Sequence, residues 1–123
     1  MKGLGIDLCA VSRIEAAMAK NDRFLERWYT QEERAYIRSR GRSGPQRAAA
    51  MFAAKEAFLK AVGLGIGRGI ALTEIAVTHN ELGAPQYALQ GAALEKLQQL
   101  GAAGAWLSNS HEGDMAAAVC VIE

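Results

Sequence analysis

A long and almost entirely apolar helix is the feature that most constrains how this chain can fold. Residues 46–62 are rich in alanine, which favours helix, and Gly63 follows them as a natural helix-ending glycine. The run 52–61, FAAKEAFLKA, leaves little room for a polar face, so we expect this helix to be buried on most sides. Within it, Glu56 and Lys60 lie four residues apart and therefore share one face.

The rest of the sequence predicts one strand, then several helices, then mostly strands. Residues 2–9 alternate as in a strand, with Leu4, Ile6 and Leu8 on one face and Asp7 on the other. Helices are expected at 12–20, 23–28, 30–38 and 91–100, and further strands at 70–79, 86–89, 105–110 and 115–122. Because no repeat or linker interrupts the chain, this order indicates a single domain over residues 1–123 of the α+β class.

Two capping boxes support the predicted helix starts. Ser12 precedes Glu15 by three residues, and Thr30 precedes Glu33 by the same spacing. In each pair, hydroxyl and carboxylate are expected to satisfy backbone N–H groups that the first turn leaves free. Glu33 is also a candidate for an ordinary surface ion pair with Arg34.

Asp7 is the oddest single residue, because it interrupts a strand that otherwise reads as buried. A carboxylate in such a strand is costly unless it has a partner. Asp7 and Glu56 together could offer oxygen ligands to Mg²⁺, which commonly takes one or two carboxylates and binds substrate phosphates. Two plainer interpretations stay open: Asp7 caps a turn at a strand end, and Glu56 forms a surface ion pair with Lys60.

The charge distribution is strongly polarised along the chain. Residues 1–68 carry 13 Lys and Arg against 7 Asp and Glu, whereas residues 69–123 carry 1 against 6. A basic half of this kind can attract an acidic partner, although an ordinary solvated surface explains it equally well. A small RNA-binding domain is a third interpretation. It is weakly supported, since few aromatic residues interleave the arginines and the isoelectric point is only about 7.8.

Other features point to the cytoplasm. No apolar run approaches the length of about 18 residues that a membrane span needs, and Asp7 lies where a signal peptide would have to be apolar. Cys9 and Cys120 form no CxxC pair and no zinc-type cluster with histidine, so we expect two buried, reduced thiols.

Several short motifs, taken together, resemble one known family. They are Gly5-Ile6-Asp7-Leu8 with Arg13-Ile14, the run 52–61 with Gly63 and Gly65-Ile66, the turn Gly83-Ala84-Pro85, and the segments 107–111 and 116–119. In this order they resemble the holo-acyl-carrier-protein synthases, the small phosphopantetheinyl transferases, and the resemblance runs from about residue 3 to 122. It implies the α+β phosphopantetheinyl transferase fold. It also implies transfer of 4′-phosphopantetheine from coenzyme A to a serine of an apo acyl carrier protein, with release of 3′,5′-ADP.

The resemblance also implies roles for individual residues. Asp7 and Glu56 would bind Mg²⁺, Lys60 would contact the phosphates, and Glu56 is the candidate for taking the serine proton. The coenzyme A contacts would be Lys60, Gly63, Gly65, Gly83, Pro85 and His111, with the glycine-rich loop 63–69 lining the nucleotide pocket. Arg13, with Arg23 and Arg27, would meet the acidic carrier protein.

The family further implies a homotrimer with sites between subunits and no role for nucleic acid or membrane. The sequence departs from the family at Met51, where an arginine is usual, and Arg47 one helical turn earlier is the candidate replacement. The alternative is a non-catalytic module of the same fold that binds a nucleotide or a carrier protein without transfer.

Overall fold

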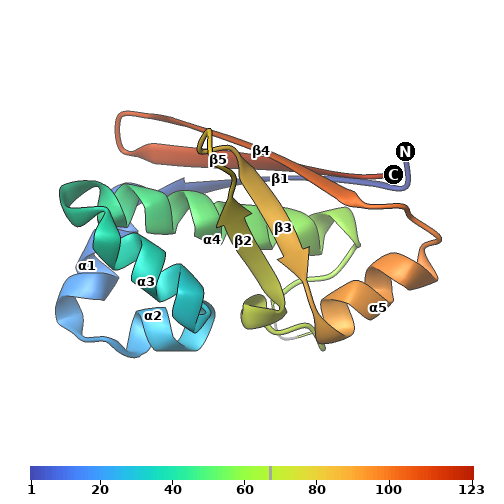
Figure 1. Cartoon of the computed structure of the whole chain (residues 1–123), viewed down its shortest axis with the longest axis horizontal. Coiled ribbons are helices and arrows are strands. Elements are labelled where there is room, and N and C mark those ends of the chain that lie inside the picture. Colours follow the sequence, from blue (N-terminus) through green and yellow to red (C-terminus); the bar gives the residue numbers. More distant parts are fainter. Residues whose placement is uncertain (67) are drawn as a thin grey trace.

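Helix α4 (Gly44–Ala61) is the longest element of the computed structural model, which describes residues 1–66 and 68–123 (Figure 1). Pro45 lies in its first turn, where a missing N–H costs no hydrogen bond. Twelve of its 18 residues are buried, which confirms the prediction of a helix covered on most sides.

A three-stranded antiparallel sheet lies along one side of α4 (Figure 1). Its strands are, in spatial order, β1 (Gly3–Ala10), β5 (Met115–Ile122) and β4 (Ala105–Glu112). A Cβ on Gly5 would clash with the carbonyl oxygen of Ala57 in α4, and Gly3 is equally close to the helix backbone. Only glycine permits such an approach. Because side chains alternate along a strand, Asp7 faces the helix as well.

The opposite face of β1 points away from α4. Leu4, Ile6 and Leu8 on this face are 58%, 63% and 60% exposed. The predicted alternation is therefore confirmed, but the expectation of a strand buried among apolar residues is wrong for a single copy of the chain. The reason is steric. Only the side of β1 that carries Gly3 and Gly5 can approach the backbone of α4 closely, so the apolar side chains point the other way.

Most of the remaining elements lie on the other side of α4 (Figure 1). In chain order the remaining elements are α1 (Val11–Lys20), α2 (Arg23–Trp28), α3 (Gln31–Ser39), the 3₁₀ turns η1 (Gly41–Ser43) and η2 (Leu72–Glu74), β2 (Ile75–His79), β3 (Pro85–Leu89) and α5 (Gly91–Gln99). Helix α5 packs beside η2. Strands β2 and β3 form a separate two-stranded antiparallel sheet. The mixture of helices and antiparallel strands confirms the α+β class.

The start of α1 differs from the prediction. Ala10 is the N-cap residue and makes no side-chain cap, so the predicted box of Ser12 and Glu15 is wrong. Instead, the carboxylate of Asp114, in the turn between β4 and β5, accepts from the backbone N–H of Ser12 at 2.9 Å and from its hydroxyl at 2.6 Å. A distant carboxylate thus replaces the local one. The second predicted box, Thr30 with Glu33, is confirmed.

Glu33 also belongs to a buried ion pair that the sequence did not reveal. Lys55 of α4 donates to a Glu33 carboxylate oxygen at 2.7 Å and to the carbonyls of Leu72 and Ile75 at 2.9 and 3.1 Å. The other Glu33 oxygen accepts from the backbone N–H of Val77 at 2.8 Å. Glu33 is therefore not a surface partner of Arg34. It links α3, α4 and β2 through fully satisfied polar groups.

Two further expectations concern the chain as a whole. Cys9 and Cys120 are free and buried, which confirms the prediction of two buried thiols. Within the part of the chain that the structure describes, the helices are too short or too polar to cross a membrane.

Candidate active site

Asp7 and Lys60 meet at the edge of the sheet formed by β1. Lys60 donates to a carboxylate oxygen of Asp7 at 2.9 Å and to the carbonyl oxygen of Ile6 at 3.1 Å. The Asp7 side chain is only 10% exposed, whereas that of Lys60 is 56% exposed. Asp7 lies within β1, so the interpretation as a turn cap is wrong. Lys60 pairs with Asp7 and not, as the plainer interpretation had it, with Glu56.

Glu56 is the second carboxylate of this cluster. Burial and then the neighbouring Asp7 carboxylate raise the pKa of Glu56 to about 7, and the charges of Arg13 and Lys60 only partly oppose this. The second carboxylate oxygen of Asp7 is buried and has no hydrogen-bond partner among the described residues. Lys60 forms an ion pair with Asp7 but none with Glu56 among the described residues, so the two carboxylates are short of positive charge.

This shortage suits a divalent cation. The described residues contain no cluster of three or more His, Cys, Asp or Glu that could enclose a metal. A pair of carboxylates is instead the donor set typical of Mg²⁺, which keeps open positions for water and phosphate. Asp7 and Glu56 therefore fit the metal that the sequence analysis expected.

Arg13 extends the cluster toward α1. Its guanidinium lies 3.7 Å from the Cys9 sulfur and 5.7 Å from the centre of the Phe52 ring, and its charge partly opposes the rise in the pKa of Glu56. The other two predicted carrier-protein residues, Arg23 and Arg27, are exposed on α2. Arg13 therefore lies near the carboxylate pair on α1, and Arg23 and Arg27 lie on α2, the next helix along the chain.

Gly63 and Gly65 follow the end of α4. Gly63 has a φ of +80°, which favours glycine, and its N–H donates to the carbonyl oxygen of Lys60 at 3.1 Å. This places the start of the predicted glycine-rich loop beside Lys60. Residue 67 of that loop lies outside the described residues.

The remaining predicted contacts gather at the other edge of the sheet. His111 of β4 and Gly83 line a small cavity of about 50 Å³ together with Gln46 and Arg47. The imidazole Nδ1 of His111 lies 2.9 Å from the side-chain nitrogen of Gln46. Pro85 is close by in the chain, at the first position of β3.

The predicted site residues therefore form two groups in one copy of the chain. Asp7 lies on β1 and His111 on β4, the two outer strands, with β5 between them. In α4, Glu56 and Arg47 are nine positions apart, which at about 100° per residue places them on opposite sides of the helix. Helix and sheet together separate the carboxylate group from the His111 group. Met51 belongs to neither, because it is buried in the core at 1% exposure.

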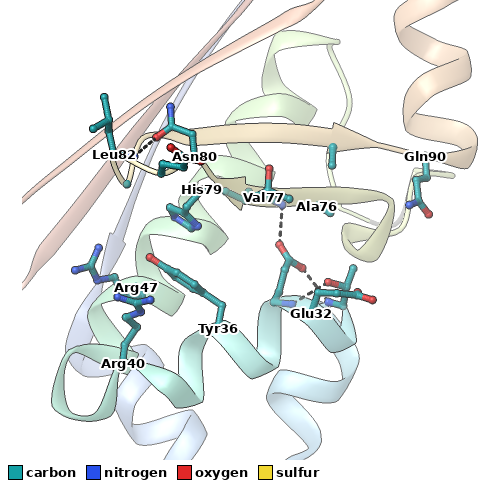
Figure 2. Close-up of a pocket in the computed structure, with 16 residues that line it drawn as sticks. Glu32, Tyr36, Arg40, Arg47, Ala76, Val77, His79, Asn80, Leu82 and Gln90 are labelled. Carbon is teal, nitrogen blue, oxygen red and sulfur yellow. Dashed lines mark hydrogen bonds between the residues drawn. The ribbon is translucent and has the colours of Figure 1, made fainter.

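A much larger cleft, of about 810 Å³, lies between α3 and the hairpin of β2 and β3 (Figure 2). No motif in the sequence predicted this cleft. Tyr36 in α3 and Arg40 at the C-cap of that helix are four positions apart and so share one face, which was a visible signal. That His79 lies on this face depends on how the hairpin packs, and no local pattern shows that.

Comparison with known proteins places the chain in a family. Residues 3–120 match the family model of the 4′-phosphopantetheinyl transferase superfamily. The holo-[acyl-carrier-protein] synthase of Treponema denticola is 44% identical over 121 residues, covering 98% of this chain and 97% of the relative. That of Trichlorobacter lovleyi is 43% identical over 122 residues, covering 98% and 96%.

Solved structures agree with these relatives. The holo-[acyl-carrier-protein] synthase of Neisseria meningitidis superposes with a TM-score of 0.88 at 36% identity, covering 100% of this chain and 98% of that one. The enzyme of Helicobacter pylori, solved in complex with coenzyme A, has a TM-score of 0.84 at 29% identity, covering 98% and 99%. The chain therefore belongs to the 4′-phosphopantetheinyl transferase superfamily, as a member of its holo-[acyl-carrier-protein] synthase family.

Proposed function

We propose that this protein, acting as one domain over residues 1–123, transfers 4′-phosphopantetheine from coenzyme A to a serine of an apo acyl carrier protein. The observation that carries the proposal is the pair of carboxylates, Asp7 and Glu56, beside Lys60 in a chain that matches the family over nearly its whole length. Two free, buried thiols are compatible with work in the cytoplasm, where thiols stay reduced.

Asp7 and Glu56 would hold Mg²⁺ through their carboxylate oxygens. The unsatisfied Asp7 oxygen and the raised pKa of Glu56 both support this assignment. When bound, Mg²⁺ supplies positive charge that offsets the negative charge building on the coenzyme A diphosphate.

The protein's own side chains perform the remaining steps. The serine hydroxyl oxygen bonds to the phosphorus that carries pantetheine, and the bond from that phosphorus to the oxygen of the departing 3′,5′-ADP breaks. Lys60, whose side chain is half exposed, offsets charge on the departing phosphate. The Glu56 carboxylate is our candidate for accepting the serine proton.

A complete coenzyme A site needs a second copy of the chain. Gly63 and Gly65 lie on the carboxylate side, whereas Gly83, Pro85 and His111 lie across the sheet. We assign all five to coenzyme A contacts, with the carboxylate edge of one copy facing the His111 edge of the next. Such a head-to-tail contact closes into a ring when the rotation permits.

The outward face of the sheet supports assembly into a homotrimer. Leu4, Ile6 and Leu8 of β1 and Trp106 of β4 are each about 60% exposed on the described chain. Several large apolar side chains exposed together on one face of a monomer mark an interaction site. Because it extends from one edge strand to the other, neighbouring copies would cover it while bringing the two edges together.

Replacing Ile6 by glutamate is expected to dissociate the trimer, since a charge would be buried without a partner. Light scattering after size-exclusion chromatography measures the mass, and transfer activity should fall with the trimer fraction. Leu94→Glu on α5, also an exposed apolar residue, is the matched control and should stay trimeric. A wild-type monomer with full activity would contradict the proposed assembly.

Replacing Arg13 by glutamate is expected to raise the KM for carrier protein about tenfold, with a smaller effect on the KM for coenzyme A, because a charge at an interface steers an acidic partner. Steady-state kinetics with each substrate varied in turn measures both constants. Lys96→Glu reverses the single basic charge of the acidic half and serves as the control. An unchanged KM for carrier protein in Arg13→Glu would argue against a docking surface on α1, and with it against the roles of Arg23 and Arg27.

Intact mass spectrometry of an apo acyl carrier protein tests the proposed reaction directly. Incubation with this protein, coenzyme A and Mg²⁺ should add one phosphopantetheine group, and EDTA should prevent the addition. If folded protein adds nothing to several carrier proteins, the non-catalytic module becomes the better interpretation.

A further inference from the structure

The turn between β4 and β5 holds the start of α1. Gly113, with a φ of +55°, and Asp114 form a two-residue turn of the kind that joins antiparallel strands tightly. Figure 1 shows this turn at the same end of the molecule as α1. The carbonyl oxygen of Asp114 accepts from the backbone N–H of Val11 at 2.7 Å. Its carboxylate accepts from the backbone N–H and the hydroxyl of Ser12 at 2.9 and 2.6 Å.

Helix α1 relies on this turn because its own sequence offers no cap. Ala10 at the N-cap position makes no side-chain hydrogen bond, and the first turn contains no acidic residue. The Asp114 carboxylate therefore satisfies an N–H group that a local side chain usually satisfies, and it places a negative charge at the positive end of the helix dipole. Within α1, all of which the structure describes, only Ile14 is buried. The hydrogen bonds at the helix start thus add to a small packing contact in orienting α1.

The corner that Asp114 holds determines where Arg13 lies. Strand β1 runs directly into α1, without a loop residue between them. Arg13 follows Ser12 in the chain, and its guanidinium reaches back over β1 to lie 3.7 Å from the Cys9 sulfur. The same strand carries Asp7 of the carboxylate pair. A change in the direction of α1 at this corner would therefore move Arg13 relative to the carboxylates.

We propose that Asp114 is a positioning residue for carrier-protein docking, which acts through Ser12 to hold Arg13 beside the carboxylate pair. This inference rests on the proposed function, in which Arg13 meets the acidic carrier protein. Asp114 is itself acidic and would repel such a partner. A purely electrostatic role therefore predicts that its removal strengthens docking, whereas the positioning role predicts that its removal weakens docking.

Replacing Asp114 by alanine is expected to raise the KM for carrier protein about fivefold, the usual effect of losing a helix cap, and to change the KM for coenzyme A less than about twofold. Asp114→Asn removes the same charge but keeps an oxygen that caps a helix equally well, so both constants should stay within about twofold of wild type. Glu15→Ala removes an acidic charge from an exposed position of α1 and should not raise the KM for carrier protein. No rise in Asp114→Ala, or an equal rise in Asp114→Asn, would overturn the proposal.

Coupling to Arg13 distinguishes positioning from a general loss of stability. In an Arg13→Ala background, Asp114→Ala should raise the KM for carrier protein less than about twofold further, because the group that it positions is already absent. A full further rise would show that Asp114 does not act through Arg13. If Asp114→Ala does not fold, Ser12→Ala provides the test. It removes the 2.6 Å hydrogen bond and should raise the same KM about threefold, and an unchanged constant would refute the positioning role.

Calorimetric titration with apo carrier protein, without coenzyme A, keeps this inference apart from the proposed function. Wild type that binds carrier protein but never modifies it refutes the proposed function alone. The positioning role is then supported by a Kd about fivefold weaker in Asp114→Ala, and refuted by an unchanged Kd. Wild type that transfers normally, with unchanged carrier-protein constants in Asp114→Ala, refutes the positioning role alone. Wild type that neither binds nor modifies any of several carrier proteins refutes both.

Discussion

Replacing Glu56 by glutamine is expected to lower the transfer rate about 100- to 1,000-fold, the usual loss when one charge-stabilising group is removed from an active site. Glutamine keeps the size of the side chain but removes the negative charge that would bind Mg²⁺ and accept the serine proton. Asp7→Asn should lose activity to a similar extent, because Asp7 lies beside Glu56 and also positions Lys60. Single-turnover transfer at saturating coenzyme A, Mg²⁺ and carrier protein measures the rate.

A measurement of folding stability distinguishes this loss of activity from unfolding of the variant. Because the pKa of Glu56 rises to about 7 in the folded chain, folding disfavours its ionised form. The stability that Glu56 contributes is therefore present below its unfolded pKa, near 4.5, and is lost as the pH rises through about 7. In EDTA above this pH, Glu56→Gln should be as stable as wild type or more so in urea titrations.

Glu95→Gln, at an exposed position of α5, is the matched control and should keep full activity. Full Mg²⁺-dependent transfer by either Glu56→Gln or Asp7→Asn would refute the metal assignment. An unfolded variant at neutral pH would instead show that the carboxylates stabilise the fold.

Replacing Lys55 by methionine is expected to cost about 3–5 kcal/mol of unfolding free energy, because it leaves the Glu33 carboxylate buried without its partner. Lys55 is 0% exposed and donates three hydrogen bonds, to one side chain and two backbone carbonyls. Methionine fills a similar volume, so the loss reports the charge and the hydrogen bonds more than packing. Urea unfolding followed by circular dichroism measures the change.

Lys60→Met is the control on the same helix. Its pair with Asp7 is half exposed on the lysine side, so we expect a change within about 1 kcal/mol. The double variant Glu33→Gln with Lys55→Met should be more stable than Lys55→Met alone, because no unpaired charge remains buried. If Lys55→Met costs no more than Lys60→Met, the buried pair does not support the fold.

Much of the secondary structure follows from local patterns. Residues 44–61 form a helix because alanine-rich sequence favours it wherever it packs. The Thr30–Glu33 box forms because both partners lie within one turn. The Ser12–Glu15 box has the same spacing yet fails, because Asp114 from a turn 102 residues later accepts from the Ser12 backbone N–H in place of Glu15, and from the Ser12 hydroxyl as well.

The candidate site was only half predictable. The motifs around Asp7, Glu56 and Lys60 identified the family, and the structure shows these three residues in one cluster. Their separation from His111 depends on strand order, since β5 from the end of the chain inserts between β1 and β4. No local pattern contains that information.

The sequence by itself determined the helix of FAAKEAFLKA, the alternation along β1, the α+β class and the family, because short-range periodicity and motif spacing encode them. Tertiary structure alone decided that the apolar side of β1 faces outward, that Lys55 meets Glu33 inside the core, and that Tyr36 stacks on His79 at a basic cleft. Each of these contacts joins residues more than 20 positions apart or depends on how closely two backbones approach. Packing of the whole chain, and not local sequence preference, determines these contacts.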